Sequence, residues 1–227
     1  MRMKKLVLFD VDKTLIESSQ GHSSSFSYAF NEVYGIDANI NIINHHGMTD
    51  QQIIIDVLKK KGLEEKEIKQ KIDKCTLLMA EYFNSITDYI DIKVLEGVYE
   101  LLEELKKRDY ILGLVTGNIE PIARKKLKIV GLEDYFKVGG FGSDDIKRTN
   151  LIKIAIKKAE ELNFKFNKNN AYLIGDTPLD IEAGKEVGII TIGVSTGIYS
   201  KEDLEKALAD YVVDNLKNKY NITKILE

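Results

Sequence analysis

Short apolar segments alternate with longer amphipathic segments along most of the chain, and this alternation limits the possible folds more than any other feature. The apolar segments lie at residues 6–9, 111–115, 138–141, 171–174, 189–194 and 211–213. Their length and their bounding turn or acidic residues are typical of buried strands. Between them, apolar residues recur with helical spacing. The pattern predicts an α/β fold, a Rossmann-like, doubly wound parallel sheet with helices on both faces.

One long stretch, residues 16–92, interrupts this alternation. Its apolar residues recur with helical spacing, as at Phe26, Ala29 and Phe30, and it contains no convincing strand. A structureless connection of that length would be very unusual inside a compact domain. We therefore expect a helical cap domain at 16–92, inserted after the first strand of a core domain formed by residues 1–15 and 93–227.

Charge and composition argue against several classes of protein. The chain has 227 residues, and its 33 basic and 36 acidic side chains are interleaved, so no basic patch predicts nucleic acid or anionic lipid as a partner. No apolar run is long enough for a transmembrane helix. The single cysteine, Cys75, excludes an internal disulfide and reads as a small core residue. We expect a cytoplasmic protein without a membrane partner, either a monomer or a homodimer.

Polar side chains follow four of the predicted strands. In an open parallel sheet the binding crevice lies outside the carboxyl ends of the strands, so these side chains are the candidates for a functional site. The candidate residues, with Gly117 included for its backbone amide, are Asp10, Asp12 and Thr14 after the first strand, Thr116, Gly117 and Asn118 after the second, Lys147 and Arg148 after the third, and Asp176 and Asp180 after the fourth.

The acidic residues of this set predict a metal site. Asp10 and Asp12 should point to the same side of an extended segment. Together with Asp176 they concentrate negative charge that requires a cation, and oxygen ligands with an open position suit Mg²⁺. Asp180 has two interpretations, because Thr177 and Asp180 also stand where a helix capping pair would stand. It could cap that helix or support the metal site.

The remaining strand ends predict an anion site. Backbone amides and the hydroxyl of Thr116-Gly117-Asn118 can cradle an anion, although a plain strand-to-helix turn would use the same residues. Lys147 and Arg148 lie at the start of a predicted helix, where a cation opposes the helix dipole and calls for a compensating anion. A phosphate would supply it.

The three histidines and one turn of the predicted cap also carry side chains that could act in a site. A histidine metal site is not expected, because adjacent His45 and His46 would diverge on a helix or a strand and His22 has no obvious partner. In the turn Gly47-Met48-Thr49-Asp50, the acid either caps a helix or faces the crevice and contacts the leaving group of a substrate.

In their order and strand context, these segments resemble the haloacid dehalogenase superfamily, in its phosphoglycolate-phosphatase-like branch with a helical cap after the first strand. The resemblance spans essentially the whole chain. The first motif of the family, Asp-x-Asp-x-Thr, is met by Asp10, Asp12 and Thr14. The second is met by Thr116, and the fourth by Gly175, Asp176 and Asp180.

The resemblance implies a Mg²⁺-dependent phosphatase that hydrolyses a small phosphorylated metabolite. Asp10 would be the nucleophile that forms an aspartyl-phosphate, and Asp12 the general acid/base. Mg²⁺ would be held by Asp10, Asp176 and the backbone carbonyl of Asp12, with Thr14 and Asp180 behind them. The phosphoryl group would bind Thr116, Gly117, Asn118 and a cation of the third motif, either Arg148 or Lys147.

Two positions depart from the family pattern. Lys13 stands where glycine is usual, which makes the backbone less permissive and adds a cation near the site. The third motif lacks its usual proline and offers two cations; we favour Arg148 over Lys147, because a guanidinium can bridge phosphoryl and carboxylate oxygens together.

Three other functions stay open at this point. A phosphomutase would pass the phosphoryl group from Asp10 to a sugar. A haloacid dehalogenase would share the Asp10 nucleophile, but it has no use for Asp12 or a metal. A non-catalytic phosphate-binding regulator would not need every expected acid. Among phosphatase substrates, phosphoglycolate, sugar phosphates, nucleoside monophosphates and pyrophosphate all remain possible.

Overall fold

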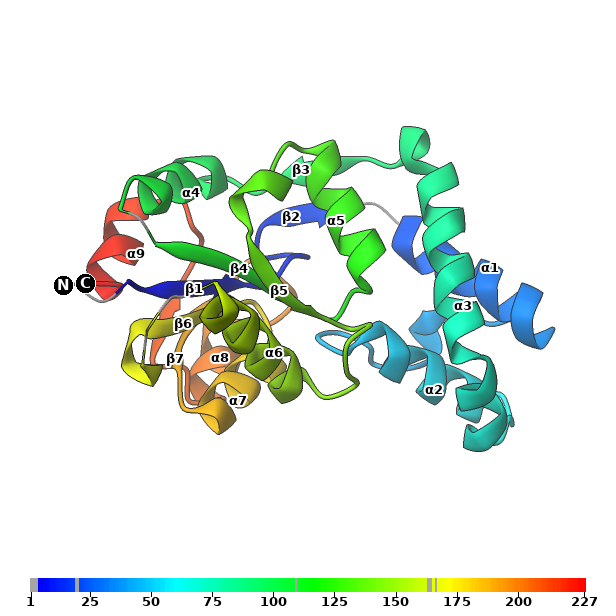
Figure 1. The fold of residues 1–227 in the computed structure, drawn as a ribbon. Coiled ribbons are helices and arrows are strands. Elements are labelled where there is room, and N and C mark those ends of the chain that lie inside the picture. Colours follow the sequence, from blue (N-terminus) through cyan, green and yellow to red (C-terminus); the bar gives the residue numbers. More distant parts are fainter. Residues whose placement is uncertain (1–3, 19–20, 109, 163–164, 166) are drawn as a thin grey trace.

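The computed structural model describes residues 4–18, 21–108, 110–162, 165 and 167–227, and it contains the predicted parallel sheet (Figure 1). Six strands lie in the order β5-β4-β1-β6-β7-β8, and every pair is parallel. This is the strand order of a classical Rossmann-like sheet. The strands are β1 (Leu6–Phe9), β4 (Ile111–Thr116), β5 (Val138–Phe141), β6 (Ala171–Gly175), β7 (Ile190–Val194) and β8 (Tyr211–Val213).

Side chains of the central strand β1 alternate between the two faces of the sheet. Leu6 and Leu8 belong to one buried cluster, whereas Val7 and Phe9 belong to another. The prediction that both faces are covered is confirmed, because a strand buried on both sides has no polar face to present to water. All six predicted strands are present within one residue of their predicted bounds.

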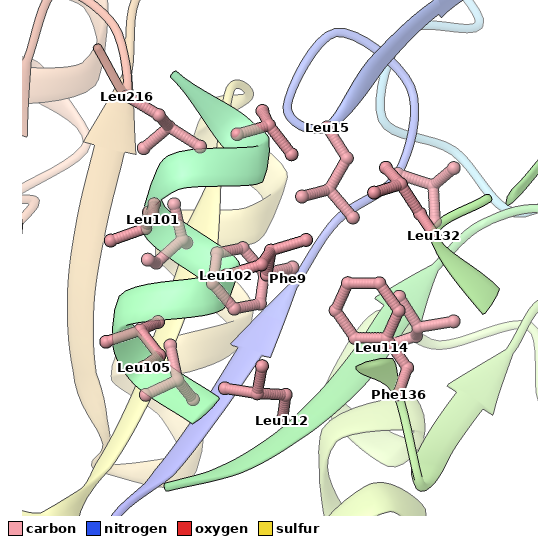
Figure 2. Close-up of a cluster of buried hydrophobic side chains, with 14 of the residues drawn as sticks. Phe9, Leu15, Leu101, Leu102, Leu105, Leu112, Leu114, Leu132, Phe136 and Leu216 are labelled. Carbon is pink, nitrogen blue, oxygen red and sulfur yellow. The ribbon is translucent and has the colours of Figure 1, made fainter. Parts of the chain in front are cut away.

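Each face is covered by its own helices. Figure 2 shows one cluster, where Leu101, Leu102 and Leu105 of α4 pack over Phe9 and Leu114 of the sheet. The helices on this face are α4 (Val98–Lys107), α5 (Glu120–Ile129) and α9 (Lys219–Ile225), and those on the other are α6 (Arg148–Glu161) and α7 (Pro178–Val187). The short helix α8 (Lys201–Lys206) lies between β7 and β8 in sequence and contacts both.

Three helices follow β1 at one end of the sheet (Figure 1). They are α1 (Gly21–Tyr34), α2 (Asp50–Lys60) and α3 (Glu65–Ser85). They share a hydrophobic cluster with Ile119 and Ile122 at the start of α5, so this helical unit packs directly on the core. Cys75 is buried in the cluster, as expected for a small core residue, and burial raises the pKa of its thiol to about 12.

A short two-stranded ribbon joins this helical unit to the core. β2 (Ile16–Ser18) pairs antiparallel with β3 (Ile92–Val94), with Ile16 opposite Val94. The expectation of no strand within 16–92 is therefore wrong at both ends of that range. Three residues are too few to display a period, and the pairing partner lies far away in sequence. Residues 1–3, 19–20, 109, 163–164 and 166 of the two expected domain ranges lie outside the described residues.

Candidate active site

A cavity of about 330 Å³ lies between the carboxyl ends of the central strands and the helical unit α1–α3. Its walls come from both parts of the chain. The core contributes Asp10, Asp12, Lys13, Thr116, Gly117, Asn118, Lys126, Arg148, Asp176 and Thr177, and the helical unit contributes residues that include His22, His45, His46, Met48 and Asp50. The topology thus brings most of the predicted strand-end residues to one place.

Arg148 links two buried carboxylates, one that lines this cavity and one that lies behind it. Its Nη2 donates to Asp10 Oδ1 at 2.7 Å, and its Nε donates to Asp180 Oδ1 at 2.7 Å. Its Nη1 also donates to the carbonyl of Gly47, in the segment before α2, at 3.1 Å. The guanidinium therefore joins the end of β1, the start of α7 and the helical unit, using the fork geometry that a lysine lacks.

Asp180 caps a helix, which is one of the two interpretations that the sequence left open. Thr177 and Asp180 form a capping box at the start of α7, in which Thr177 N and Oγ1 donate to Asp180 Oδ2 at 3.1 and 2.7 Å. The other carboxylate oxygen of Asp180 accepts from Arg148. The side chain of Asp180 therefore caps α7 and also orients the guanidinium of Arg148.

Three buried carboxylates lie close enough to hold a metal ion. Asp10, Asp176 and Asp180 each offer an oxygen within 4.8 Å of the others. Burial raises the pKa of Asp10 to about 7 against the opposing effect of Arg148, and it raises the pKa of Asp176 to about 8, with Asp10 adding to the shift. Thr14 Oγ1 lies 3.4 Å from Asp176 Oδ1. The hard oxygen donors and their mutual repulsion fit a divalent cation.

The carboxylate of Asp12 has a different environment. Lys126 Nζ donates to both of its oxygens, at 2.8 and 2.7 Å, and Asn118 Nδ2 donates at 2.8 Å. Ser18 Oγ adds a bond of 3.2 Å. Although burial acts to raise it, the pKa of Asp12 stays below its ordinary value, because the charge of Lys126 and the hydrogen bonds from Lys126 and Asn118 favour the charged form. The pKa of Asp10 is thus raised and the pKa of the neighbouring Asp12 is lowered.

Asp12 lies beyond the end of β1, so the alternation of side chains along a strand does not explain its position. The strand β1 ends at Phe9, and a turn follows in which Lys13 has a φ of 63°. Glycine adopts that left-handed conformation without strain, which explains its usual presence there. Lys13 lines the cavity and pairs with Glu17.

The segment after β4 packs closely against the helical unit. Thr116 Oγ1 accepts from Asn118 N at 3.3 Å and from Asn118 Nδ2 at 3.1 Å. A Cβ atom on Gly117 would lie 2.2 Å from the carbonyl oxygen of Met48, so only glycine allows this approach. Gly117 O in turn accepts from Asp50 N at 2.8 Å.

Two expectations about the histidines are corrected. His22 does have partners, since its Nε2 lies 3.1 Å from Asp50 Oδ2 and its Nδ1 lies 3.3 Å from Lys126 Nζ. His45 and His46 stack at 4.6 Å between ring centroids, because their segment is neither helix nor strand. His45 Nδ1 is buried and has no hydrogen-bond partner in the described part of the chain.

The two third-motif cations have different positions. Arg148 is buried in the cavity wall, whereas Lys147 is exposed at the N-cap of α6 and does not line the cavity. The geometry therefore brings together all the predicted site residues except Lys147. Their roles stay predictions.

Sequence reasoning missed Lys126. A signal for it exists, because the buried face of α5 comprises Ile122, Ala123, Lys126 and Leu127, and a lysine in such a stripe is unusual. In sequence, Lys126 resembles its neighbours Lys125, which is half-buried, and Lys128, which is exposed. The sequence marks Asp50 as a candidate, but no local pattern predicts its contact with Ile119 of the core, 69 positions away.

The fold and the site together define a class of protein: a doubly wound α/β protein with an acidic cavity at the carboxyl ends of its strands, covered by an inserted helical unit. The chain belongs to the haloacid dehalogenase-like hydrolase family, whose model matches residues 7–194. The resemblance inferred from the motifs is thereby confirmed, and the chain is a hydrolase of this family. In the part of the chain that the structure describes, no helix is long and apolar enough to cross a membrane.

Similar proteins cover nearly the whole chain. Pyrophosphatase PpaX of Bacillus cereus (strain Q1) is 29% identical over 216 residues, covering 93% of each chain. A structure described as a predicted phosphatase from Clostridium acetobutylicum is 25% identical, with a TM-score of 0.75 and coverage of 98% of this chain and 100% of that one. A hydrolase structure from Pseudomonas syringae, 20% identical with a TM-score of 0.74 and coverage of 99% and 100%, shares the fold.

Proposed function

We propose that this chain is a Mg²⁺-dependent phosphatase that acts on a small phosphorylated metabolite through an aspartyl-phosphate on Asp10. One observation carries the proposal: a single cavity holds the buried carboxylate of Asp10, oriented by Arg148, beside the separately oriented carboxylate of Asp12. Phosphoryl transfer needs a positioned nucleophile, neutralised charge and a group that manages the leaving-group proton.

The two aspartates would divide the reaction between them. An oxygen of Asp10 bonds to phosphorus as the bond from phosphorus to the leaving oxygen breaks, and Asp12 donates a proton to that oxygen. Water then attacks the aspartyl-phosphate and gives a proton back to Asp12. This second step releases inorganic phosphate and restores Asp10.

The other site residues would bind and neutralise the phosphoryl group. Arg148, Thr116 and the amides of Gly117 and Asn118 would hold its oxygens, and we assign the third-motif role to Arg148 because Lys147 lies outside the cavity. Asp10, Asp176 and the backbone carbonyl of Asp12 would hold Mg²⁺, with Thr14 and Asp180 supporting them. When bound, the cation would offset the repulsion between the carboxylates and the phosphate dianion.

The helical unit would act as the cap that selects the substrate. We propose that residues 16–92 form this cap domain and that 1–15 and 93–227 form the catalytic core. A cavity of about 330 Å³ suits a small molecule. The name of the Bacillus cereus relative makes pyrophosphate the first candidate to test, alongside small phosphate monoesters.

The test combines metal removal with the loss of the nucleophile. The purified chain should hydrolyse para-nitrophenyl phosphate or pyrophosphate with Mg²⁺ and lose that activity in excess chelator. Asp10→Asn should abolish turnover while keeping the fold, since the amide is nearly isosteric but a poor nucleophile. Acid-quenched wild type should carry a phosphoryl group on the peptide that contains Asp10. Asp37→Asn, at an exposed position in the loop after α1, is the matched control.

Activity that survives complete metal removal would contradict the magnesium assignment. Substantial turnover by Asp10→Asn would move the nucleophile to another residue.

A further inference from the structure

The core helix α5 begins without a capping side chain of its own. Its N-cap residue is Ile119, which makes no side-chain cap bond, and the third helical position is Ile122. A capping box would need Ser or Thr at the first of these positions and Glu or Gln at the second. The first amides of a helix lack partners within the helix. Ser143 Oγ accepts from Glu120 N at 3.1 Å, and the amide of Ile119 needs another acceptor.

Asp50 of the cap supplies that acceptor. Ile119 N donates to Asp50 Oδ2 at 2.8 Å, and the two residues lie 69 positions apart in sequence. Asp50 is only 2% exposed. Its own helix does not need it as a cap, because Thr49 is the N-cap of α2 and accepts from Gln52 N. A carboxylate at this position also favours the positive end of the α5 dipole.

The same carboxylate orients His22. An ammonium group can only donate, so the contact between Lys126 Nζ and His22 Nδ1 requires that Nδ1 accept. The ring proton then lies on Nε2 and is donated to Asp50 Oδ2. His22 comes from α1, so Asp50 joins two cap helices to the start of α5.

Lys126 extends this series of hydrogen bonds to Asp12 and Asn118. It lies on α5 seven residues, or about two helical turns, after Ile119, on the same face. Besides His22, it donates to both carboxylate oxygens of Asp12 and to Asn118 Oδ1 at 2.7 Å. The polar contacts run without a break from Ile119 through Asp50, His22 and Lys126 to Asp12.

We propose that Asp50 is a positioning residue: it caps the core helix α5 from the cap side and, through His22 and Lys126, makes the orientation of Asp12 depend on contact between cap and core. The inference rests on the proposed acid/base role of Asp12. It replaces the interpretation of Asp50 as the cap of its own helix, because Thr49 holds that place. The interpretation that Asp50 contacts a leaving group stays a prediction.

Three variants of the full chain test the inference. Asp50→Ala removes the acceptor, and Asp50→Asn keeps an oxygen that can accept from both Ile119 N and His22. Asp56→Ala, on the same helix and outside the cavity, is the matched control. Asp50→Ser, whose hydroxyl is too short to reach, replaces the alanine variant if that variant does not fold.

The first two measurements do not depend on enzymatic activity of the chain. Hydrogen exchange of the Ile119 amide, followed by NMR, should be faster by about tenfold or more in Asp50→Ala and close to wild type in Asp50→Asn. The amide of Leu114, in the centre of β4, should not change. The ¹⁵N spectrum of the His22 ring should show the Nε2–H tautomer in wild type and a mixed population in Asp50→Ala.

The third measurement is turnover of para-nitrophenyl phosphate with Mg²⁺. Asp50→Ala should lower kcat by about tenfold or more with a smaller change in KM, because a mispositioned Asp12 impairs the reaction more than binding. Asp50→Asn should recover most of this loss, and Asp56→Ala should match wild type.

Unchanged Ile119 exchange in Asp50→Ala would overturn the inference, and so would faster exchange with an unchanged kcat, since Asp50 would then only stabilise a helix. A wild-type chain without activity on any phosphate compound would instead contradict the proposed function. In that case Ile119 exchange and the His22 spectrum would still decide whether Asp50 organises α5 and Lys126.

Discussion

The guanidinium of Arg148 and the carboxylate of Asp10 form a buried ion pair, with Nη2 and Oδ1 2.7 Å apart. The side chains are 8% and 9% exposed, so water screens the pair weakly. The neighbouring Lys147 is exposed and lies outside the cavity. Adjacent cations in one sequence motif therefore have different electrostatic environments.

The first prediction compares these two cations. Arg148→Ala should lower kcat/KM with an aryl phosphate by about 100-fold, or about 3 kcal/mol, whereas Lys147→Ala should cost about 1 kcal/mol or less. Removing the arginine leaves Asp10 and Asp180 without their shared partner, so thermal melts must confirm that the variant is folded. Arg148→Lys should fall between the two. The reverse ranking would reassign the third-motif role to Lys147.

The second prediction concerns stability and pH in the metal-free protein. The folded-state pKa values of Asp10 and Asp176, about 7 and about 8, lie above the ordinary value of 3.8. Groups with raised pKa values contribute stability at low pH and lose it as the pH rises through those values. The melting temperature in chelator should therefore fall between pH 5 and pH 8. The lowered pKa of Asp12 acts below this window.

Added Mg²⁺ should reverse this loss, and its stabilising effect should grow over the same pH range, because the cation binds the charged carboxylates. Asp176→Asn should show a flatter pH dependence in chelator than wild type or the exposed control Asp37→Asn. A stabilisation by Mg²⁺ of equal size at pH 5 and pH 8 would contradict this account.

The third prediction concerns Lys126. Its ammonium helps to hold the pKa of Asp12 below the ordinary value, against the effect of burial. Lys126→Met keeps most of the side-chain volume but removes the charge, so the pKa of Asp12 should rise. The first step needs protonated Asp12, so the alkaline limb of the pH–rate profile, where Asp12 loses that proton, should move to higher pH. Lys128→Met, exposed on the same helix, is the control. Superimposable pH profiles for the two variants would separate Lys126 from the acid/base step.

The fourth prediction concerns the close approach of cap and core at Gly117. A methyl group there would meet the carbonyl oxygen of Met48 at 2.2 Å, so Gly117→Ala should force the cap away from the core. We expect kcat/KM to fall by about tenfold or more, because displaced groups lose their near-attack geometry. Gly35→Asn is a suitable control, since that glycine has a φ of +66°, which asparagine tolerates, and open space around it. Unchanged kinetics in Gly117→Ala would show that cap contact at this point is not required for turnover.

Much of the fold followed from local sequence. A strand buried on both faces must be apolar along its length, so all six strands could be recognised as short apolar runs. Because parallel strands end at one edge of the sheet, the order of the polar strand ends was enough to group Asp10, Thr116 and Asp176 in one cavity. The capping box of Thr177 and Asp180 is likewise local, since its partners lie three residues apart.

The tertiary structure alone decided the contacts between cap and core. Lys126 and Asp12 lie 114 residues apart, and His22 and Lys126 lie 104 apart, so no local pattern connects them. In sequence, Lys126 resembles its solvent-exposed neighbour Lys128; the packing of α5 between sheet and cap buries the first and leaves the second in water. The chain by itself therefore determined which residues end the strands. How the inserted helices pack on α5 determined which charges surround Asp12, because an electrostatic environment depends on distances in space and not along the chain.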